Sequence, residues 1–158
     1  IGKKLCSISY DKLQKCNYLD SVARETLRLY PPAATTRYAS DPNANAGGFQ
    51  LGNSIVHLNF YAMQRDEDVW VDADKFVPER FLGEEGKKMV SSFSFLPFSK
   101  GSRDCIGKYF AMLELKIALA ALICRYDANV VDRGEVYTTR LTSIPMGGCK
   151  VNLSRKKL

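Results

Sequence analysis

A glycine-rich loop with a single cysteine is the segment of this sequence best suited to chemistry. It reads FSKGSRDCIG over residues 98–107, and an apolar segment that predicts a helix follows at once. A thiol at a helix N-terminus faces unpaired N–H groups and the positive end of the helix dipole, which favour the thiolate form. Gly101 and Gly107 carry no Cβ, so the backbone can turn sharply and approach a flat ligand closely. The loop is therefore suited to delivering the Cys105 thiolate to a ligand.

Three chemistries fit such a thiol. As a nucleophile it lacks a nearby base, because the only histidine, His57, is distant in sequence, and a phosphatase-like loop would place its arginine after the cysteine. As a metal ligand it has no co-ligands nearby, so a macrocycle such as haem would supply the others. As an inert cysteine it would simply be buried before a core helix. Arg103, which can bind a carboxylate or phosphate, and Phe98, which can shield the sulfur, favour a functional loop.

Composition excludes several other classes of protein. The 158 residues suit one domain, with 46% hydrophobic and 25% charged residues and a net charge of +6. Basic residues cluster only in the short tail 155–157, so we expect no nucleic-acid partner. Five widely spaced cysteines without a C-x-x-C pair indicate a reducing compartment, and one histidine argues against a zinc cluster. The longest apolar run, 117–124, is too short to span a bilayer, so the chain is expected to be soluble as given and to be a piece of a longer protein.

The elements that position the loop can be predicted from periodicity. Residues 10–16 indicate a short helix or turn, and a helix from Asn17 ends at Pro31, because proline disfavours the α conformation in the residue before it. Its apolar stripe, expected to face the core, is formed by Leu19, Val22, Ala23, Thr26, Leu27 and Tyr30.

The rest of the chain predicts small sheets, a meander and one long helix. Residues 33–58 read as short strands separated by turns, and residues 59–65 as a short helix. Residues 66–100 show no sustained period but many aromatics, as in a segment that wraps over something. The helix from Ile106 to about Arg125 is apolar almost all round and is expected to be buried, with exceptions at Lys108, Glu114 and Lys116. Short strands are expected around residues 129–131, 136–142 and 149–153, which makes the fold class α+β.

Three motifs, which occur along the chain in the same order as in the cytochrome P450 family, resemble motifs of that family. The loop from Phe98 to Gly107 is similar to the family's haem-binding F-x-x-G-x-R-x-C-x-G, and E-T-L-R, from Glu25 to Arg28, is similar to its E-x-x-R. F-V-P-E-R-F, residues 76–81, is similar to the family's F-x-P-E-R-F. The sequence W-V-D, residues 70–72, lies between E-T-L-R and F-V-P-E-R-F. The resemblance runs from about Tyr10 to the end. It implies a mainly helical P450 fold, present in part, with residues 1–158 as a single partial domain, the C-terminal haem-binding third.

The resemblance also implies a role for each matched residue. Cys105 would be the axial thiolate of haem b, which pushes electron density onto iron and favours O–O cleavage. Arg103 and Arg37 would bind haem propionates, and Phe98 would pack beside the sulfur. Gly101 and Gly107 would form the turns on either side of Cys105. Thr35 and Thr36, with Tyr38, would touch substrate. By themselves Glu25 and Arg28 read as a surface ion pair; the resemblance instead implies a buried structural network with Arg80.

Further implications concern function and partners. The parent protein would be a monooxygenase, an oxidoreductase that oxidises a small apolar substrate with O₂ and electrons from an NADPH-dependent reductase or ferredoxin. The fragment alone would be inactive. If eukaryotic, the parent would be membrane-associated at the cytosolic face of the endoplasmic reticulum. Lysines 87, 88, 100 and 108 would form a docking face for an acidic electron donor, or are ordinary solvated lysines.

The sequence departs from the family pattern at two places. Gln64-Arg65-Asp66 stands where members often show H-R-D, and Gln50-Leu51-Gly52 where many show P-x-G. This chain also shows no glycine–acid–threonine helix motif. Two alternatives therefore stay open: a non-catalytic haem-binding remnant, and a basic interaction domain with a merely buried Cys105.

Overall fold

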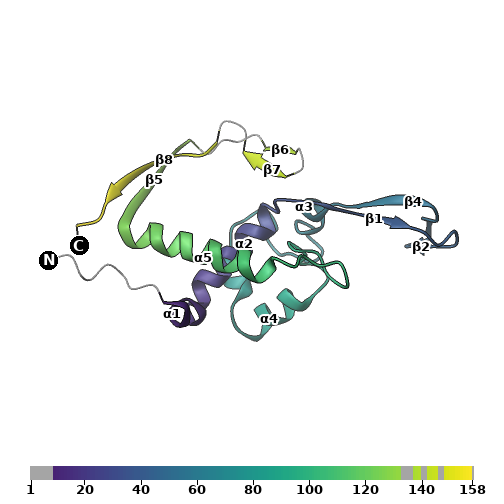
Figure 1. Ribbon diagram of the computed structural model, residues 1–158, viewed down its shortest axis with the longest axis horizontal. Coiled ribbons are helices and arrows are strands. Elements are labelled where there is room, and N and C mark those ends of the chain that lie inside the picture. Colours follow the sequence, from purple (N-terminus) through teal and green to yellow (C-terminus); the bar gives the residue numbers. More distant parts are fainter. Residues whose placement is uncertain (1–8, 133–136, 140–141, 146–147, 158) are drawn as a thin grey trace.

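The fold is α+β: the helices lie together in the middle of the molecule, and small two-stranded antiparallel sheets lie to either side of them (Figure 1). The computed structural model describes residues 9–132, 137–139, 142–145 and 148–157. Within these ranges no helix is both long enough and apolar enough to cross a membrane.

The first two helices, α1 (Tyr10–Lys15) and α2 (Asn17–Leu29), match the predicted helices. The predicted core face of α2 is wrong. Of the expected stripe only Ala23 is buried, and Tyr30 is exposed. The buried set is largely polar and comprises Ser21, Ala23, Glu25, Arg28 and Leu29. The apolar periodicity of α2 did not predict its buried face, because an ion network with distant residues places the polar side of the helix in the interior.

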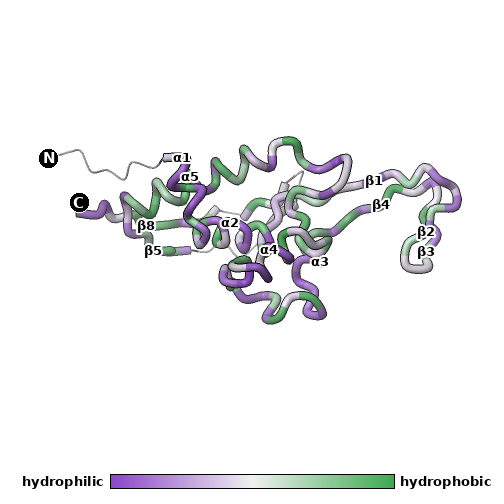
Figure 2. The backbone as a smooth tube through the Cα atoms, turned by 90° about the horizontal axis from the view of Figure 1, so that it is seen from below, coloured by the Kyte–Doolittle hydropathy of each residue, from purple (hydrophilic) through white to green (hydrophobic). Residues whose placement is uncertain are grey.

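A long hairpin follows the two prolines and extends from the helices as an arm (Figures 1 and 2). Strand β1 (Thr35–Ala39) pairs antiparallel with β4 (Ser54–Leu58), from Thr35 opposite Leu58 to Ala39 opposite Ser54. At the tip, β2 (Asn45–Ala46) pairs with β3 (Phe49–Gln50). The predicted strands in residues 33–58 are therefore confirmed.

The segment from residue 59 to 100 contains more structure than its sequence predicts. The expected short helix is present as α3 (Phe60–Met63), but a 3₁₀ helix, η1 (Pro78–Phe81), and helix α4 (Gly83–Ser91) also form. Two glycines weaken the helical signal of α4, since glycine has low helix propensity. An aromatic cluster of Trp70, Phe81 and Phe95 forms the core, with the rings of Phe81 and Phe95 4.8 Å apart.

Helix α5 (Lys108–Arg125) forms as predicted, but its expected burial is wrong. The only buried residue of α5 is Lys116, whereas Tyr109 and Phe110 are 80% and 71% exposed. Among the described residues α2 is the helix that packs along α5, and one neighbour can cover only one face. Hydrophobic residues recur along the exposed remainder (Figure 2).

Two small hairpins complete the chain. Strand β5 (Tyr126–Asp132) pairs antiparallel with β8 (Lys150–Arg155), and β6 (Tyr137–Thr139) with β7 (Ser143–Pro145). The strands predicted around residues 129–131 and 149–153 are confirmed, with ends that differ from the prediction by one to three residues. Of the strand predicted over residues 136–142, Val136, Arg140 and Leu141 lie outside the described residues.

Candidate functional site

The cysteine loop is closed by backbone hydrogen bonds within itself. The Cys105 N–H donates to the Phe98 carbonyl at 2.9 Å, and the Asp104 N–H donates to the Gly101 carbonyl at 3.2 Å. At its end the Lys108 N–H donates to the Cys105 carbonyl at 3.3 Å as α5 begins. Gly101 has φ +87°, a left-handed conformation that side chains with a Cβ rarely adopt. The loop therefore holds Cys105 at a defined position just before α5.

The thiol of Cys105 is free and exposed. A Cβ added at Gly107 would lie 3.8 Å from its sulfur, so the absence of a side chain there keeps space beside the sulfur open. The alternative of an inert buried cysteine does not fit this exposure.

The described part of the chain provides no cluster of metal-binding side chains at Cys105. Within the described ranges no group of three or more histidine, cysteine, aspartate or glutamate residues could hold a metal ion. An exposed sulfur donor, open space at Gly107 and cationic side chains near the loop fit a haem with its acidic propionates.

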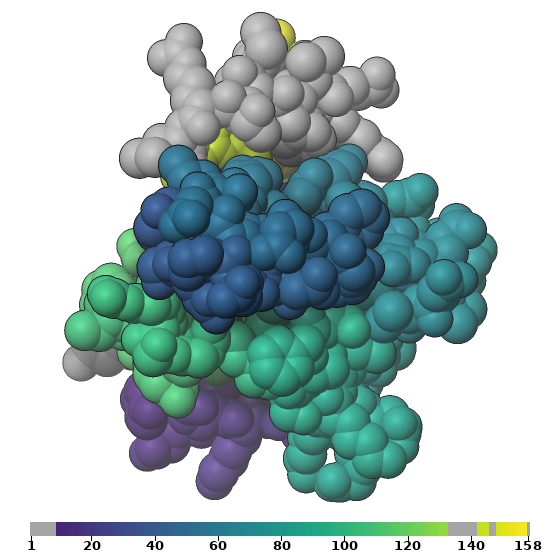
Figure 3. Space-filling model, turned by 90° about the vertical axis from the view of Figure 1, so that its right-hand side faces the viewer, coloured from purple at the N-terminus to yellow at the C-terminus, as the bar shows by residue number. Residues whose placement is uncertain are grey.

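Arg37 connects the β1–β4 arm to the cysteine loop. Its Nη2 donates to Ser99 Oγ at 3.1 Å and to the Arg103 carbonyl at 3.3 Å, and its Nη1 donates to Thr35 Oγ1 at 2.6 Å. Figure 3 looks along the arm and shows the segment around residue 100 beside it. The Arg103 side chain is exposed and makes no ion pair with any residue in the described ranges. The structure thus brings these two predicted arginines to the same loop.

The carboxylate of Asp104 faces the first residue of α5. Lys108 Nζ lies 2.5 Å from Asp104 Oδ2. This hydrogen bond is the main cause that raises the pKa of the Lys108 ammonium above 10.5, its usual value. The pair holds the loop to the start of α5 and partly neutralises the lysine.

Glu25 is the centre of a buried ion network. Arg28 donates from Nε to Glu25 Oε2 at 2.7 Å, and Arg80 donates from Nε to Oε1 at 3.1 Å. The Val77 N–H also donates to Oε1, at 2.8 Å. Arg28 binds the Gln64 and Ala73 carbonyls, each at 2.7 Å. Glu25 and Arg28 are 0% exposed, so the reading as a surface pair is wrong.

Gln64 is a contact residue that sequence reasoning missed. It is 0% exposed, and its Nε2 donates to the Leu27 and Arg28 carbonyls at 3.2 and 3.0 Å. Its Oε1 accepts from the Leu96 N–H at 2.9 Å, just before the cysteine loop. The sequence offered one sign that this position matters: Gln64 stands where members of the family often have the histidine of H-R-D.

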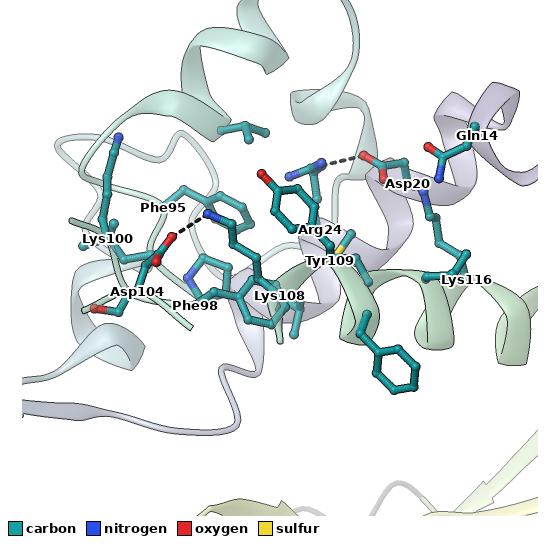
Figure 4. A pocket seen from close by; sticks show the side chains of 18 of the residues that line it. Gln14, Asp20, Arg24, Phe95, Phe98, Lys100, Asp104, Lys108, Tyr109 and Lys116 are labelled. Carbon is teal, nitrogen blue, oxygen red and sulfur yellow. Dashed lines mark hydrogen bonds and ion pairs between the residues drawn. The ribbon is translucent and has the colours of Figure 1, made fainter. Parts of the chain in front are cut away.

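A cavity of about 870 Å³ lies between α2, the cysteine loop and α5 (Figure 4). Phe95 and Phe98 line it together with Asp20, Lys108 and Lys116. A second cavity of about 530 Å³ is lined by Pro31, Thr36, His57 and Ser143 among others. Thr36 therefore faces a cavity, whereas the Thr35 hydroxyl is bound by Arg37.

Each of the four lysines expected at a docking face has a partner. Lys87 pairs with Glu84 and Lys88 with Glu85, both on the exposed side of α4, and Lys108 pairs with Asp104. Lys100 donates to the Ser91 carbonyl and lies 4.5 Å from the centre of the Phe93 ring. Three of the four charges are thus balanced by nearby carboxylates.

Comparison with known proteins gives a consistent result. The family model described as Cytochrome P450 matches residues 1–148. The chain is 37% identical over 137 residues to Cytochrome P450 9e2 of Blattella germanica, and 42% identical over 123 residues to Cytochrome P450 4A12 of Rattus norvegicus. These matches cover 82% and 77% of the chain but only 25% and 24% of the relatives. The chain therefore spans about a quarter of their length.

Solved structures agree with these relatives. A cyanobacterial CYP120A1 with bound retinoic acid matches with a TM-score of 0.85 and 29% identity, over 94% of this chain and 35% of that one. A second protein, CYP102L1, matches with a TM-score of 0.84 and 29% identity, over 99% of this chain and 35% of that one.

Proposed function

Because the chain belongs to the cytochrome P450 family, we propose that it is the haem-binding part of a monooxygenase in which the Cys105 thiolate is the axial ligand of iron. Residues 1–158 form one partial domain of that enzyme. The observation that carries the proposal is the free, exposed Cys105 thiol just before α5, where the described part of the chain offers no cluster of metal-binding side chains.

The cofactor proposed is haem b, iron protoporphyrin IX, which when bound supplies the activation of O₂ for insertion of one oxygen atom into an apolar substrate. The role of this chain is to bind the haem. Cys105 donates electron density through its sulfur, and the adjacent N-terminus of α5 stabilises the thiolate. Arg37 and Arg103 bind the propionates, and Phe98 shields the sulfur. Gly101 makes the turn, and Gly107 leaves room beside the sulfur.

The substrate and partners that we propose are those that membership of the family suggests. Thr36, in the cavity of His57 and Ser143, contacts a small apolar substrate, with Thr35 next to it on β1. Electrons come from an NADPH-dependent reductase or a ferredoxin. We propose that the parent, if eukaryotic, lies at the endoplasmic reticulum membrane, on its cytosolic face; the matches to proteins of Blattella germanica and Rattus norvegicus support a eukaryotic parent.

The test is replacement of Cys105 by alanine in the intact parent protein. We expect loss of the strongly red-shifted Soret band of the reduced carbon monoxide complex, together with loss of substrate oxidation. Cys149→Ala is the matched control, because Cys149 is also free and exposed, and it should change neither. An unchanged spectrum in the Cys105 variant overturns the proposal. A thiolate-type spectrum without O₂-dependent product in the unmodified protein identifies a non-catalytic haem-binding remnant instead.

A further inference from the structure

The cysteine loop is tied to α2 where the chain enters it. The buried Gln64 amide bridges the last carbonyls of α2 to the Leu96 N–H, two residues before Phe98. Gln64 is itself held, because Arg28 donates to its backbone carbonyl. The loop entrance is thus joined directly to the Glu25 network through one fully hydrogen-bonded side chain.

The chain is tied to α2 again beyond the loop, within α5 (Lys108–Arg125). Lys116 is 6% exposed, and its Nζ lies 3.2 Å from Asp20 Oδ1 on α2. Asp20 Oδ2 in turn lies 2.5 Å from Arg24 Nε (Figure 4). Burying an ammonium group is unfavourable unless a counter-charge compensates it. An apolar helix that buries its lysine, and leaves its aromatic residues exposed, therefore depends on Asp20 for that position.

The geometry of α5 connects this ion pair to the sulfur. Lys116 follows Lys108 by eight residues, about 12 Å along a helix that rises 1.5 Å per residue. Both lysines line the cavity between α2 and the loop. Lys108 holds Asp104, the residue before Cys105. A shift of α5 along α2 would therefore move the residues that carry the thiol.

We propose that α2 holds the cysteine loop from both sides, through Gln64 at the entrance and through the Asp20–Lys116 pair on the helix that follows the loop, and that these three side chains are positioning residues for the Cys105 sulfur. The inference rests on the proposed role of Cys105 as axial ligand. The inference adds that α2 influences the strength and persistence of the sulfur–iron bond, in addition to stabilising the folded protein.

The experiment uses the intact parent protein with Gln64→Leu, Lys116→Met and the double variant. The readout is the ratio of thiolate-ligated to thiol-ligated carbon monoxide complex in the folded, reduced protein, with the reduction potential as a second measurement. Gln64→Leu leaves buried polar groups unpaired, so we expect a roughly fivefold shift of this ratio toward the thiol-ligated form. The double variant should shift further than either single one. Lys116→Arg keeps the charge and should restore most of the original ratio.

Controls separate a positioning role from a structural one. Lys88→Met removes a lysine from a surface pair with Glu85 and should leave the ratio unchanged. If Gln64→Leu does not fold, Gln64→Asn keeps both functional groups on a shorter side chain and should shift the ratio in the same direction. A lower melting temperature with an unchanged ratio and potential overturns the inference. An unmodified protein without any thiolate-ligated complex overturns the proposed function instead.

Discussion

Arg80 donates a hydrogen bond from Nε to Glu25 Oε1 at 3.1 Å, although 55 residues separate them in the chain. The acceptor carboxylate is fully buried and also binds Arg28. Through this contact the meander, with η1 at its centre, is fixed against α2. The cysteine loop follows the meander, so its position depends on a carboxylate far from the sulfur in sequence.

Replacement of Glu25 by alanine should destabilise the parent protein strongly. Two guanidinium groups would remain buried or half-buried without their counter-charge, and removing one partner of a buried ion pair costs on the order of 3–5 kcal/mol in free energy of unfolding. Denaturant unfolding measures this. Glu84→Ala, in an exposed pair with Lys87, is the matched control and should cost about 0–1 kcal/mol. Equal losses in both variants would contradict a buried network.

Gly86→Ala should also destabilise the protein, against the usual rule for helices. In an exposed helix interior this change would stabilise by about 1 kcal/mol. Here a Cβ would lie 2.1 Å from the backbone carbon of Phe81, so α4 would have to move away from η1. Thermal unfolding compares this variant with Ser91→Ala, at an exposed position of the same helix. A higher melting temperature for Gly86→Ala would show that the helices do not approach this closely.

Arg37→Gln should weaken retention of the cofactor. The variant loses the guanidinium that contacts Ser99 and the Arg103 carbonyl, and with it one proposed propionate partner. The rate of haem transfer from the intact parent to excess apomyoglobin measures this, and we expect it to rise. Arg125→Gln, at the far end of α5, should leave the rate unchanged. Equal rates in both variants would exclude Arg37 from the cofactor site.

Lys108 should remain protonated to higher pH than an ordinary lysine. Its pKa is raised chiefly by the hydrogen bond to Asp104, so the folded state holds this proton more tightly than the unfolded state. The resulting stabilisation is fully present below the usual lysine pKa of 10.5, and is lost as the pH rises through the folded value. NMR titration of the lysine side chains checks this. Asp104→Asn should return the pKa of Lys108 toward 10.5; no change would exclude Asp104 as the cause.

The cysteine loop and the regular elements were predictable from local sequence. Helices α1, α2, α3 and α5 and the β1–β4 hairpin follow from periodicity, prolines and turn residues, which act over a few positions. Helix α4 was missed because its glycines weaken a short signal. The family resemblance rested on motifs of four to ten residues, and these also act locally.

The sequence by itself determined that one cysteine, set between glycines and an arginine, stands at the start of a helix. Only the tertiary structure decided that the polar side of α2 is the buried one, that Lys116 meets Asp20, and that Gln64 reaches Leu96. The physical reason is that periodicity reports where apolar residues recur. Burial of a charge or an amide instead depends on partners that come from distant segments, and their proximity is settled only when the chain folds.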